Sequence, residues 1–169
     1  MKRKSQNLKV IKKRNIFKGF NKINEYVFKY KHLSNKWSNV LKREIYSPRN
    51  AVAILPYDPN QNKVLLIKQF RIGAYLAGFD PWQIEIIAGC VDKSDLSSEE
   101  AILRETKEES GIILDKKNLK IINHILNSPG TTSEKTDIFF CECDLGNSGG
   151  IFGCKDENEE IESFTCDVF

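Results

Sequence analysis

The chain has 169 residues with 40% hydrophobic and 29% charged side chains, a composition that is ordinary for a globular protein with a buried core. No apolar run approaches the roughly 20 residues needed to span a bilayer, and the start MKRKSQNLKVIKK lacks the apolar core of a secretory signal. Five cysteines without paired metal spacing fit a reducing compartment, so we expect a soluble, cytoplasmic protein.

The formal net charge of +3 hides a division between two parts of the chain. Residues 1–50 contain 15 Lys or Arg and 2 Glu, giving +13, whereas residues 51–169 contain 11 Lys or Arg and 21 Asp or Glu, giving −10. The basic part is either an RNA-binding arm or a β subdomain that gathers an anionic substrate or docks on an acidic surface. We favour the subdomain because apolar residues interleave with the charges as they do in strands, namely Ile16, Phe17, Phe20, Tyr26, Val27 and Phe28.

The pattern of apolar runs and turn residues predicts the elements in chain order. Residues 1–50 predict three short strands, near 9–18, 25–33 and 39–47. Further strands are predicted at 51–55, 64–71, 82–88, 119–126, 137–145 and about 161–169, with a loop at 72–81 and a Gly-rich acidic loop before the last strand. A mixed sheet with a helix implies a layered α/β domain. We therefore predict a basic N-terminal β subdomain at 1–50 and an α/β domain at 51–169.

The most informative segment is GCVDKSDLSSEEAILRETKEESGI, which runs from Gly89 to Ile112. Its second half predicts a helix over about 99–110, because residues suited to the two ends of a helix flank that stretch. These expected end residues are Ser97 or Ser98 as N-cap, Glu99 and Glu100 in the first turn, and Gly111 at the C-terminal end.

Three glutamates of this helix, Glu105, Glu108 and Glu109, share one face because helical neighbours lie three and four residues apart. Like charges at this spacing repel, and each close pair costs roughly a few tenths of a kcal/mol unless a divalent cation absorbs the charge. Carboxylate oxygens suit Mg²⁺ or Mn²⁺ rather than a soft metal. Arg104 stands four residues before Glu108 and can hold that carboxylate in one orientation. The alternative is an ordinary solvated helix face.

The segment resembles the Nudix box, in which a glycine, five residues, Glu and seven residues precede the pattern Arg-Glu-apolar-any-Glu-Glu-any-Gly-apolar. The matching positions are Gly89, Arg104, Glu105, Glu108, Glu109, Gly111 and Ile112. There are three departures: Asp95 stands at the first Glu position, one extra residue separates it from Arg104, and Thr106 replaces the usual aliphatic residue. None of them touches the glutamate face. The resemblance implies the Nudix fold, an α/β/α sandwich with a mixed sheet, here preceded by the antiparallel β subdomain.

Outside the box, the segments QFRIGAYLAGFDPWQIEIIAG, NSPGTTSEKTD and GIFGCKDENEEIE resemble bacterial ADP-ribose pyrophosphatases of the Nudix superfamily, from about Phe17 onward. This resemblance implies Mg²⁺-dependent hydrolysis of ADP-ribose to AMP and ribose 5-phosphate, with Mn²⁺ as an alternative ion. It implies a homodimer whose N-terminal strands cross to the partner and complete its adenosine site. The family also continues with a C-terminal helix that this sequence lacks, which we expect to lower stability rather than activity.

The resemblance also assigns roles to particular residues. Its metal ligands are the carbonyl of Ala88 and the carboxylates of Glu105, Glu109 and Glu159. Its catalytic residues are Glu157 as general base, Glu108 acting through water, and Arg104. Its substrate contacts are Phe20 and Asn21 for adenosine, Arg43 and Arg71 for the diphosphate and nucleotide, and Cys90, Ser128 and Glu134. Cys90 departs from the usual apolar residue type.

Three other functions remain open on the sequence. The nearest is a Nudix hydrolase of another nucleoside diphosphate sugar. The second is a nucleotide sensor that keeps the fold and binds ADP-ribose without consuming it. The third is an RNA-binding protein that uses the basic half, although we expect nucleic acid not to be the partner.

Overall fold

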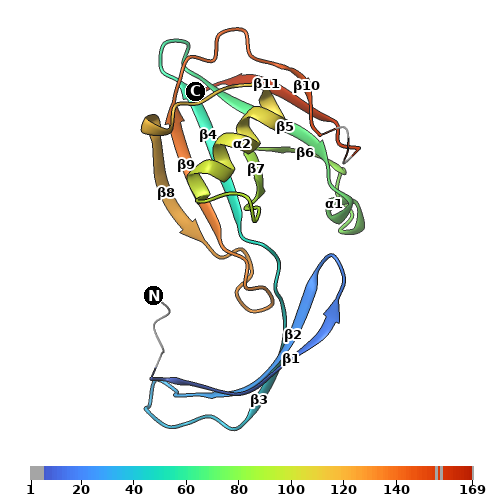
Figure 1. Cartoon of the computed structure of the whole chain (residues 1–169), viewed down its shortest axis with the longest axis vertical. Helices are drawn as coiled ribbons and strands as arrows, with labels where there is room; N and C mark the ends of the chain where they lie inside the picture. Colours follow the sequence, from blue (N-terminus) through green and yellow to red (C-terminus); the bar gives the residue numbers. More distant parts are fainter. Residues whose placement is uncertain (1–5, 155, 157, 169) are drawn as a thin grey trace. The chain divides into compact units, whose positions relative to one another are not determined.

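The computed structural model describes residues 6–154, 156 and 158–168, and its contacts divide the chain into two compact units. The first unit comprises the described residues up to Arg49 together with Leu126–Glu134. It contains an antiparallel sheet in the order β1-β2-β3, as the three predicted strands indicated. The bounds of these strands are Leu8–Lys18 for β1, Lys22–Tyr30 for β2 and Leu41–Tyr46 for β3 (Figure 1).

A buried carboxylate ties the three strands of the first unit together. Glu25 lies in the middle strand and is 6% exposed, and it forms ion pairs with Arg14 on β1 and Lys42 near the start of β3. The hydrogen bond from Lys42 lowers the pKa of Glu25, and the charge of Arg14 adds to this effect. Glu25 is therefore the buried counter-charge of this basic sheet, although β1 stays exposed along its whole length.

The second unit is built on one mixed sheet whose main path runs β10-β11-β5-β4-β9-β8. Strands β4 and β9 pair in parallel and the other neighbours pair antiparallel. Short strands β6 and β7 attach to β5 and β4. The bounds are Ala51–Asp58 (β4), Lys63–Phe70 (β5), Trp82–Glu85 (β6), Ile87–Cys90 (β7), Leu119–Ile125 (β8), Thr136–Glu142 (β9), Gly150–Phe152 (β10) and Ile161–Asp167 (β11).

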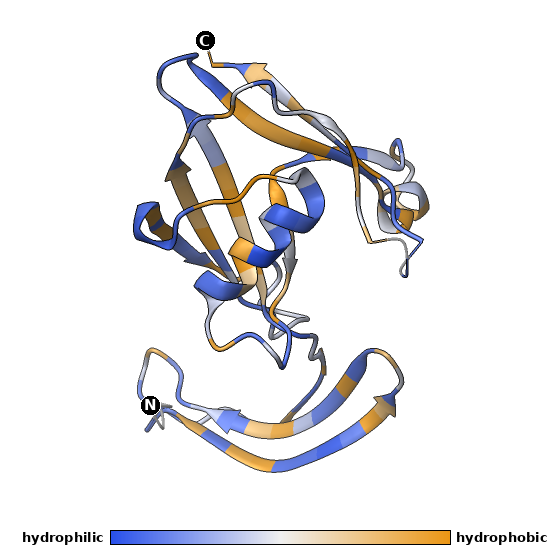
Figure 2. Ribbon diagram, turned by 45° about the horizontal axis from the view of Figure 1, so that its top comes forward, coloured by the Kyte–Doolittle hydropathy of each residue, from blue (hydrophilic) through white to orange (hydrophobic). Residues whose placement is uncertain are grey.

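One long helix, α2 (Ser98–Ser110), lies against this sheet, and the core is formed between them (Figure 1). The helix contributes Ala101 and Ile102, which pack on fully buried sheet residues such as Ile54 and Ile67. Figure 2 shows that the central strands of this sheet are mostly apolar and that α2 carries hydrophilic residues as well as apolar ones. The other helical segments are α1 (Ile72–Leu76) and the 3₁₀ turn Lys116–Asn118. Within the described residues, no helix has both the length and the apolar character that a membrane crossing requires.

Three local features differ from the sequence expectations. The predicted strand 82–88 is two strands, because the chain leaves β5 after Glu85 and joins β4 from Ile87. The predicted loop 72–81 begins with the single-turn helix α1, and the Gly-rich loop contains the three-residue strand β10. All three features depend on pairing or packing with distant segments, which local patterns do not encode.

Candidate active site

Both ends of α2 are fixed by side chains and turns that the sequence predicted. The Ser97 hydroxyl accepts a hydrogen bond from the Glu100 amide at 3.3 Å, and the Glu100 carboxylate accepts one from the Leu96 amide at 3.0 Å. Gly111 ends the helix in the left-handed conformation at φ 72°. Such caps satisfy backbone groups that would otherwise lack partners, so the register of the glutamates on α2 is set locally.

The departure at Thr106 is accommodated within the helix. This residue is fully buried, and its hydroxyl donates to the carbonyl of Ile102, one turn earlier, at 2.6 Å. A buried hydroxyl is tolerated when it has such a partner. Threonine therefore fills the place of the usual aliphatic residue without leaving an unsatisfied polar group.

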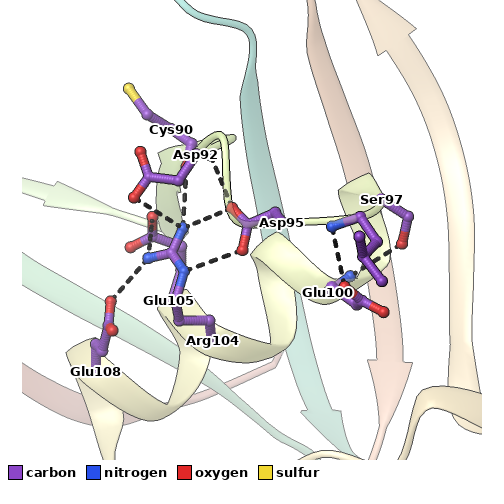
Figure 3. Close-up of polar contacts among 9 residues, drawn as sticks. Cys90, Asp92, Asp95, Ser97, Glu100, Arg104, Glu105 and Glu108 are labelled. Atoms are coloured by element: carbon purple, nitrogen blue, oxygen red, sulfur yellow. Dashed lines mark hydrogen bonds and ion pairs between the residues drawn. The ribbon is translucent and has the colours of Figure 1, made fainter.

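Arg104 binds carboxylates from the helix and from the loop before it (Figure 3). Its Nη1 donates to Glu105 and to Glu108, each at 2.9 Å, which confirms the predicted pairing with Glu108. Its Nε and Nη2 donate to the two oxygens of Asp95 at 3.3 and 3.0 Å, and Nη2 also donates to the Cys90 carbonyl. The shorter acid at the first Glu position thus still forms a two-pronged bond with the arginine, which fixes the loop on the helix.

A glycine leaves the space that Glu105 occupies. A Cβ added to Gly89 on β7 would lie 2.0 Å from the carboxyl carbon of Glu105, so the carboxylate rests directly on the strand backbone. Burial raises the pKa of Glu105, and the charge of Arg104 opposes that rise. The opening glycine of the box therefore has a steric purpose, which is to admit this carboxylate.

Glu109 lies deepest in the site, at 5% exposure, and accepts a hydrogen bond from the Ala88 amide at 3.2 Å. Burial raises the pKa of Glu109 to about 8, and the negative charges of Glu105 and Glu159 add to the rise. Carboxylates forced together in this way are typical of sites that bind a positive charge.

Arg71 is the basic side chain beside these acids. It follows β5 and forms a two-pronged ion pair with Glu85 on β6, with its Nε and Nη2 at 2.9 to 3.3 Å from the carboxylate oxygens. Burial would lower the pKa of Arg71, but the bonds to Glu85 and the charges of Glu109 and Glu159 outweigh it and raise the pKa. Arg71, Gln69 and Glu159 line one small cavity of about 200 Å³.

The donor set fits a hard divalent cation in its chemistry. Glu105, Glu109 and Glu159 supply only oxygen atoms, and the charges of Glu105 and Glu159 both act on Glu109. Within residues 6–154, 156 and 158–168, however, no three His, Cys, Asp or Glu side chains form a group spaced around one ion. Glu105 is bonded to Arg104 and Glu109 to the amide of Ala88, so cation binding requires these side chains to reorient.

The structure therefore brings together, in the second unit, most of the residues predicted for metal binding and catalysis. Arg104 contacts Glu105, Glu108 and the backbone of Cys90, while Arg71 and Glu159 line the neighbouring cavity. The predicted general base, Glu157, lies outside the described residues.

The remaining predicted substrate contacts belong to the first unit. Phe20, at the turn between β1 and β2, is 93% exposed, and Asn21 accepts a hydrogen bond from the Tyr46 hydroxyl at 2.8 Å. Arg43 lines a largely apolar cavity of about 580 Å³ with residues of β1, β2 and the 126–134 loop. Ser128 and Glu134 lie in that loop, where Glu134 accepts a weak bond from Asn127 at 3.4 Å.

Glu85 was missed by the sequence analysis although both of its oxygens bind Arg71. The strand pattern gave no signal for it, because Glu85 ends β6, which pairs with β5, whereas Ile87 begins β7, which pairs with β4. Gln69 was missed as well; it is 2% exposed, and its Nε2 has no hydrogen-bond partner among the described residues.

Comparisons with known proteins identify the family of the chain. A family model described as NUDIX domain matches residues 47–169. The ADP-ribose pyrophosphatase of Escherichia coli strain K12 is 36% identical over 154 residues, covering 91% of this chain and 72% of that protein. The protein of the same name from Haemophilus influenzae is 34% identical over 160 residues, with coverages of 93% and 72%.

Two further relatives widen the comparison. The GDP-mannose pyrophosphatase of Pectobacterium atrosepticum is 34% identical over 145 residues, covering 82% of this chain and 70% of that protein. A crystal structure described as ADP compounds hydrolase superposes with a TM-score of 0.56 at 17% identity, covering 81% of this chain and 68% of that one. At that identity the superposition supports the fold alone.

Proposed function

The chain belongs to the Nudix family and is a hydrolase that acts on a pyrophosphate bond, and we propose that its substrate is ADP-ribose, cleaved to AMP and ribose 5-phosphate. The observation that carries this proposal is that the charges of Glu105 on the same helix and of Arg71 after β5 both act on the buried Glu109 of α2. Acids that can hold divalent cations then lie beside a base that can hold phosphate.

The proposed chemistry follows from the charge of the substrate. A diphosphate repels an incoming nucleophile, so its charge must be neutralised before water can attack it. Bound Mg²⁺, with Mn²⁺ as its substitute, would supply that neutralisation and acidify the attacking water. We assign the metal-holding role to the Ala88 carbonyl, Glu105, Glu109 and Glu159.

The chain's own side chains would do the rest. Arg71 would donate hydrogen bonds to a diphosphate oxygen, and Arg104 orients Glu105 and Glu108 through its two bonds of 2.9 Å. Glu108 would hold a water molecule beside the site. Glu157 would accept the proton of the attacking water, a role that rests on the sequence resemblance alone. No covalent intermediate with the protein is required.

ADP-ribose is preferred to other nucleoside diphosphate sugars because the relatives that cover most of this chain carry that name. GDP-mannose is the alternative, since relatives of that name match with similar identity over a shorter stretch. We further propose a cytoplasmic location, which agrees with an odd number of cysteines that lack paired metal-binding spacing.

The first test is release of AMP from ADP-ribose in the presence of Mg²⁺. We expect the wild-type chain to release AMP, and Glu109→Gln to lower kcat by about 100-fold or more, because the substitution removes a buried carboxylate charge. Glu162→Gln is the matched control, since Glu162 is an exposed residue of β11 outside the site. Glu157→Gln tests the general base in the same assay.

The outcomes separate the alternatives. Faster turnover of GDP-mannose than of ADP-ribose would replace the proposed substrate. Tight binding of ADP-ribose by a folded wild type that releases no AMP would indicate a nucleotide sensor. Steeply salt-dependent binding of RNA, without turnover of either nucleotide sugar, would favour the RNA-binding alternative.

A further inference from the structure

Both carboxylate oxygens of Glu85 accept hydrogen bonds from Arg71. Nε of Arg71 lies 3.1 Å from Oε1, and Nη2 lies 2.9 Å from Oε2. Two parallel bonds of this kind fix both the position and the plane of the guanidinium. Since both oxygens are occupied, Glu85 is not a free ligand for a cation, and Nη1 of Arg71 takes no part in the pair.

Other carboxylates compete for the same guanidinium. Glu109 and Glu159 both act on the charge of Arg71, and Glu159 lines the same cavity as Arg71. An arginine side chain has several rotatable bonds, so without a fixed partner it turns to the nearest acid. Here the acids whose charges also act on Arg71 are Glu109 and Glu159, two of those that we assign to the metal. An arginine bonded to them would occupy the lone pairs that a cation needs.

We propose that Glu85 is a positioning residue that keeps Arg71 away from the metal-binding carboxylates. Glu109 and Glu159 then stay available to divalent cations, while Nη1 of Arg71 stays available to the diphosphate. This inference rests on the proposed function of the site as a metal-dependent hydrolase. It concerns which carboxylate pairs with Arg71, and it does not concern the chemical step.

The main competing explanation is that Glu85 only holds β6 against β5. Glu85 lies opposite Ile67 in that pairing, so loss of its ion pair could simply loosen the sheet. A second explanation is that its negative charge attracts the cation directly. If the ion pair only holds β6, Arg71→Ala breaks it as well, so both single variants and the double variant would bind Mn²⁺ equally weakly. If the charge of Glu85 attracts the cation directly, removing Glu85 would weaken binding equally with and without Arg71. Our proposal differs from both, because only Glu85→Gln with Arg71 present should lose affinity.

A double-mutant cycle separates these explanations. The four proteins are wild type, Glu85→Gln, Arg71→Ala and the double variant, and the measurement is binding of Mn²⁺ without substrate, followed by electron paramagnetic resonance. We expect Glu85→Gln to weaken Mn²⁺ binding about tenfold, because a charge-assisted bond from Arg71 then competes for Glu109 or Glu159. We expect the double variant to bind Mn²⁺ as Arg71→Ala does.

Controls keep the result interpretable. Glu162→Gln removes an exposed acid from the same sheet, where it lies opposite Lys68, and should leave Mn²⁺ binding unchanged. Thermal unfolding of all variants shows whether each one is folded. In the activity assay, Glu85→Gln should raise the Mg²⁺ concentration for half-maximal rate about tenfold.

Each outcome decides the matter. Equal weakening of Mn²⁺ binding by Glu85→Gln with and without Arg71 would overturn the proposal, as would wild-type binding in Glu85→Gln or absence of Mn²⁺ binding in the wild type. Rescue by Arg71→Ala would support it. A wild type that binds Mn²⁺ and shows this rescue, but does not cleave ADP-ribose, would refute the proposed substrate and leave the role of Glu85 intact.

Discussion

At the scale of single residues, the space left by Gly89 determines where Glu105 lies. The strand backbone at Gly89 is not in the left-handed region, so alanine is compatible with the local conformation, and only the contact with Glu105 excludes a side chain. An added methyl group would force the carboxylate to move by an ångström or more. The consequence should appear in catalysis before it appears in folding.

We therefore expect Gly89→Ala to lower kcat/KM for ADP-ribose by about 100-fold, because a displacement of roughly 1 Å in a reacting group has that effect. Steady-state kinetics at several Mg²⁺ concentrations measures the change. Gly73→Ala is the control, since a Cβ at Gly73 meets nothing within 4 Å. Wild-type kinetics in Gly89→Ala would show that the Glu105 carboxylate can move to another position without loss of activity.

The residue scale also shows what the sequence could predict in the site. The pair Arg104–Glu108 follows from helix geometry alone, and the structure has it at 2.9 Å. The pair Arg71–Glu85 spans 14 residues and exists only because β5 and β6 pair in one particular register. Sequence reasoning found Arg71 by resemblance but had no means of finding its partner.

At the scale of elements, Asp137 joins the start of α2 to the sheet. Its carboxylate lies on β9 and is 4% exposed; it accepts hydrogen bonds from Ser98 at 2.7 Å and Lys135 at 2.8 Å, and contacts His124 on β8 at 2.5 Å. Burial would raise the pKa of Asp137, but the bonds from Lys135, Ser98 and His124 outweigh it and hold the pKa below 3.8. The ionised form is thus the one that stabilises the fold.

Because folding lowers the pKa of Asp137, the loss of stability caused by Asp137→Asn depends on pH. The stabilisation is fully present above the ordinary pKa of 3.8 and disappears as the pH falls through the lower pKa of the folded protein. We expect Asp137→Asn to lower Tm by about 4 °C at pH 6, and we expect the gap to close as the pH falls below 3.8 and through the lowered pKa of the folded protein. Calorimetry across this range measures it, with exposed Asp167→Asn as control. A gap that is independent of pH would contradict the assignment.

Elements with local signals were predicted well. The helix α2 has its caps and its apolar face within one short stretch, and it begins and ends within one residue of the prediction. The break between β6 and β7, the five-residue helix α1 and the three-residue strand β10 were not predicted. Each of them is too short to carry a period of its own and is held by a neighbour that lies far away in the sequence.

At the scale of the whole molecule, the division of charge and the exposed first strand lead us to propose the homodimer that the sequence resemblance implies. Every residue of β1 is exposed, including Val10, Ile16 and Phe17 at 40% to 54%. A strand edge with such residues is a ready partner for another chain. The +13 of residues 1–50 and the −10 of residues 51–169 would then attract each other between subunits.

We expect sedimentation to give the mass of two 19.4 kDa chains. Mixing Phe20→Ala with Glu109→Gln, after dissociation and reassembly, should recover about a quarter of wild-type activity, because half of the dimers then contain one complete site. Each variant assayed alone is the control. A mixture no more active than the mean of the two variants would show that Phe20 serves its own chain or neither.

The apolar residues placed between charges predict the three-stranded sheet. They do not predict that a distant segment joins the same unit. The segment Leu126–Glu134 belongs to the first unit, although about 80 residues of the second unit precede it in the chain. Backbone bonds between Tyr46 and the carbonyl of Thr131 and the amide of Ser133 hold it there. Nothing in residues 1–50 indicates that such a segment is required.

That discontinuity sets an order of events during synthesis on the ribosome. The amino-terminal strands leave the exit tunnel first, yet the loop that completes their unit emerges only after most of the second sheet. At roughly 5–20 residues per second the delay is about 10 seconds. During that delay the first unit lacks Leu126–Glu134, so its folding can be completed only after most of the chain has been synthesised.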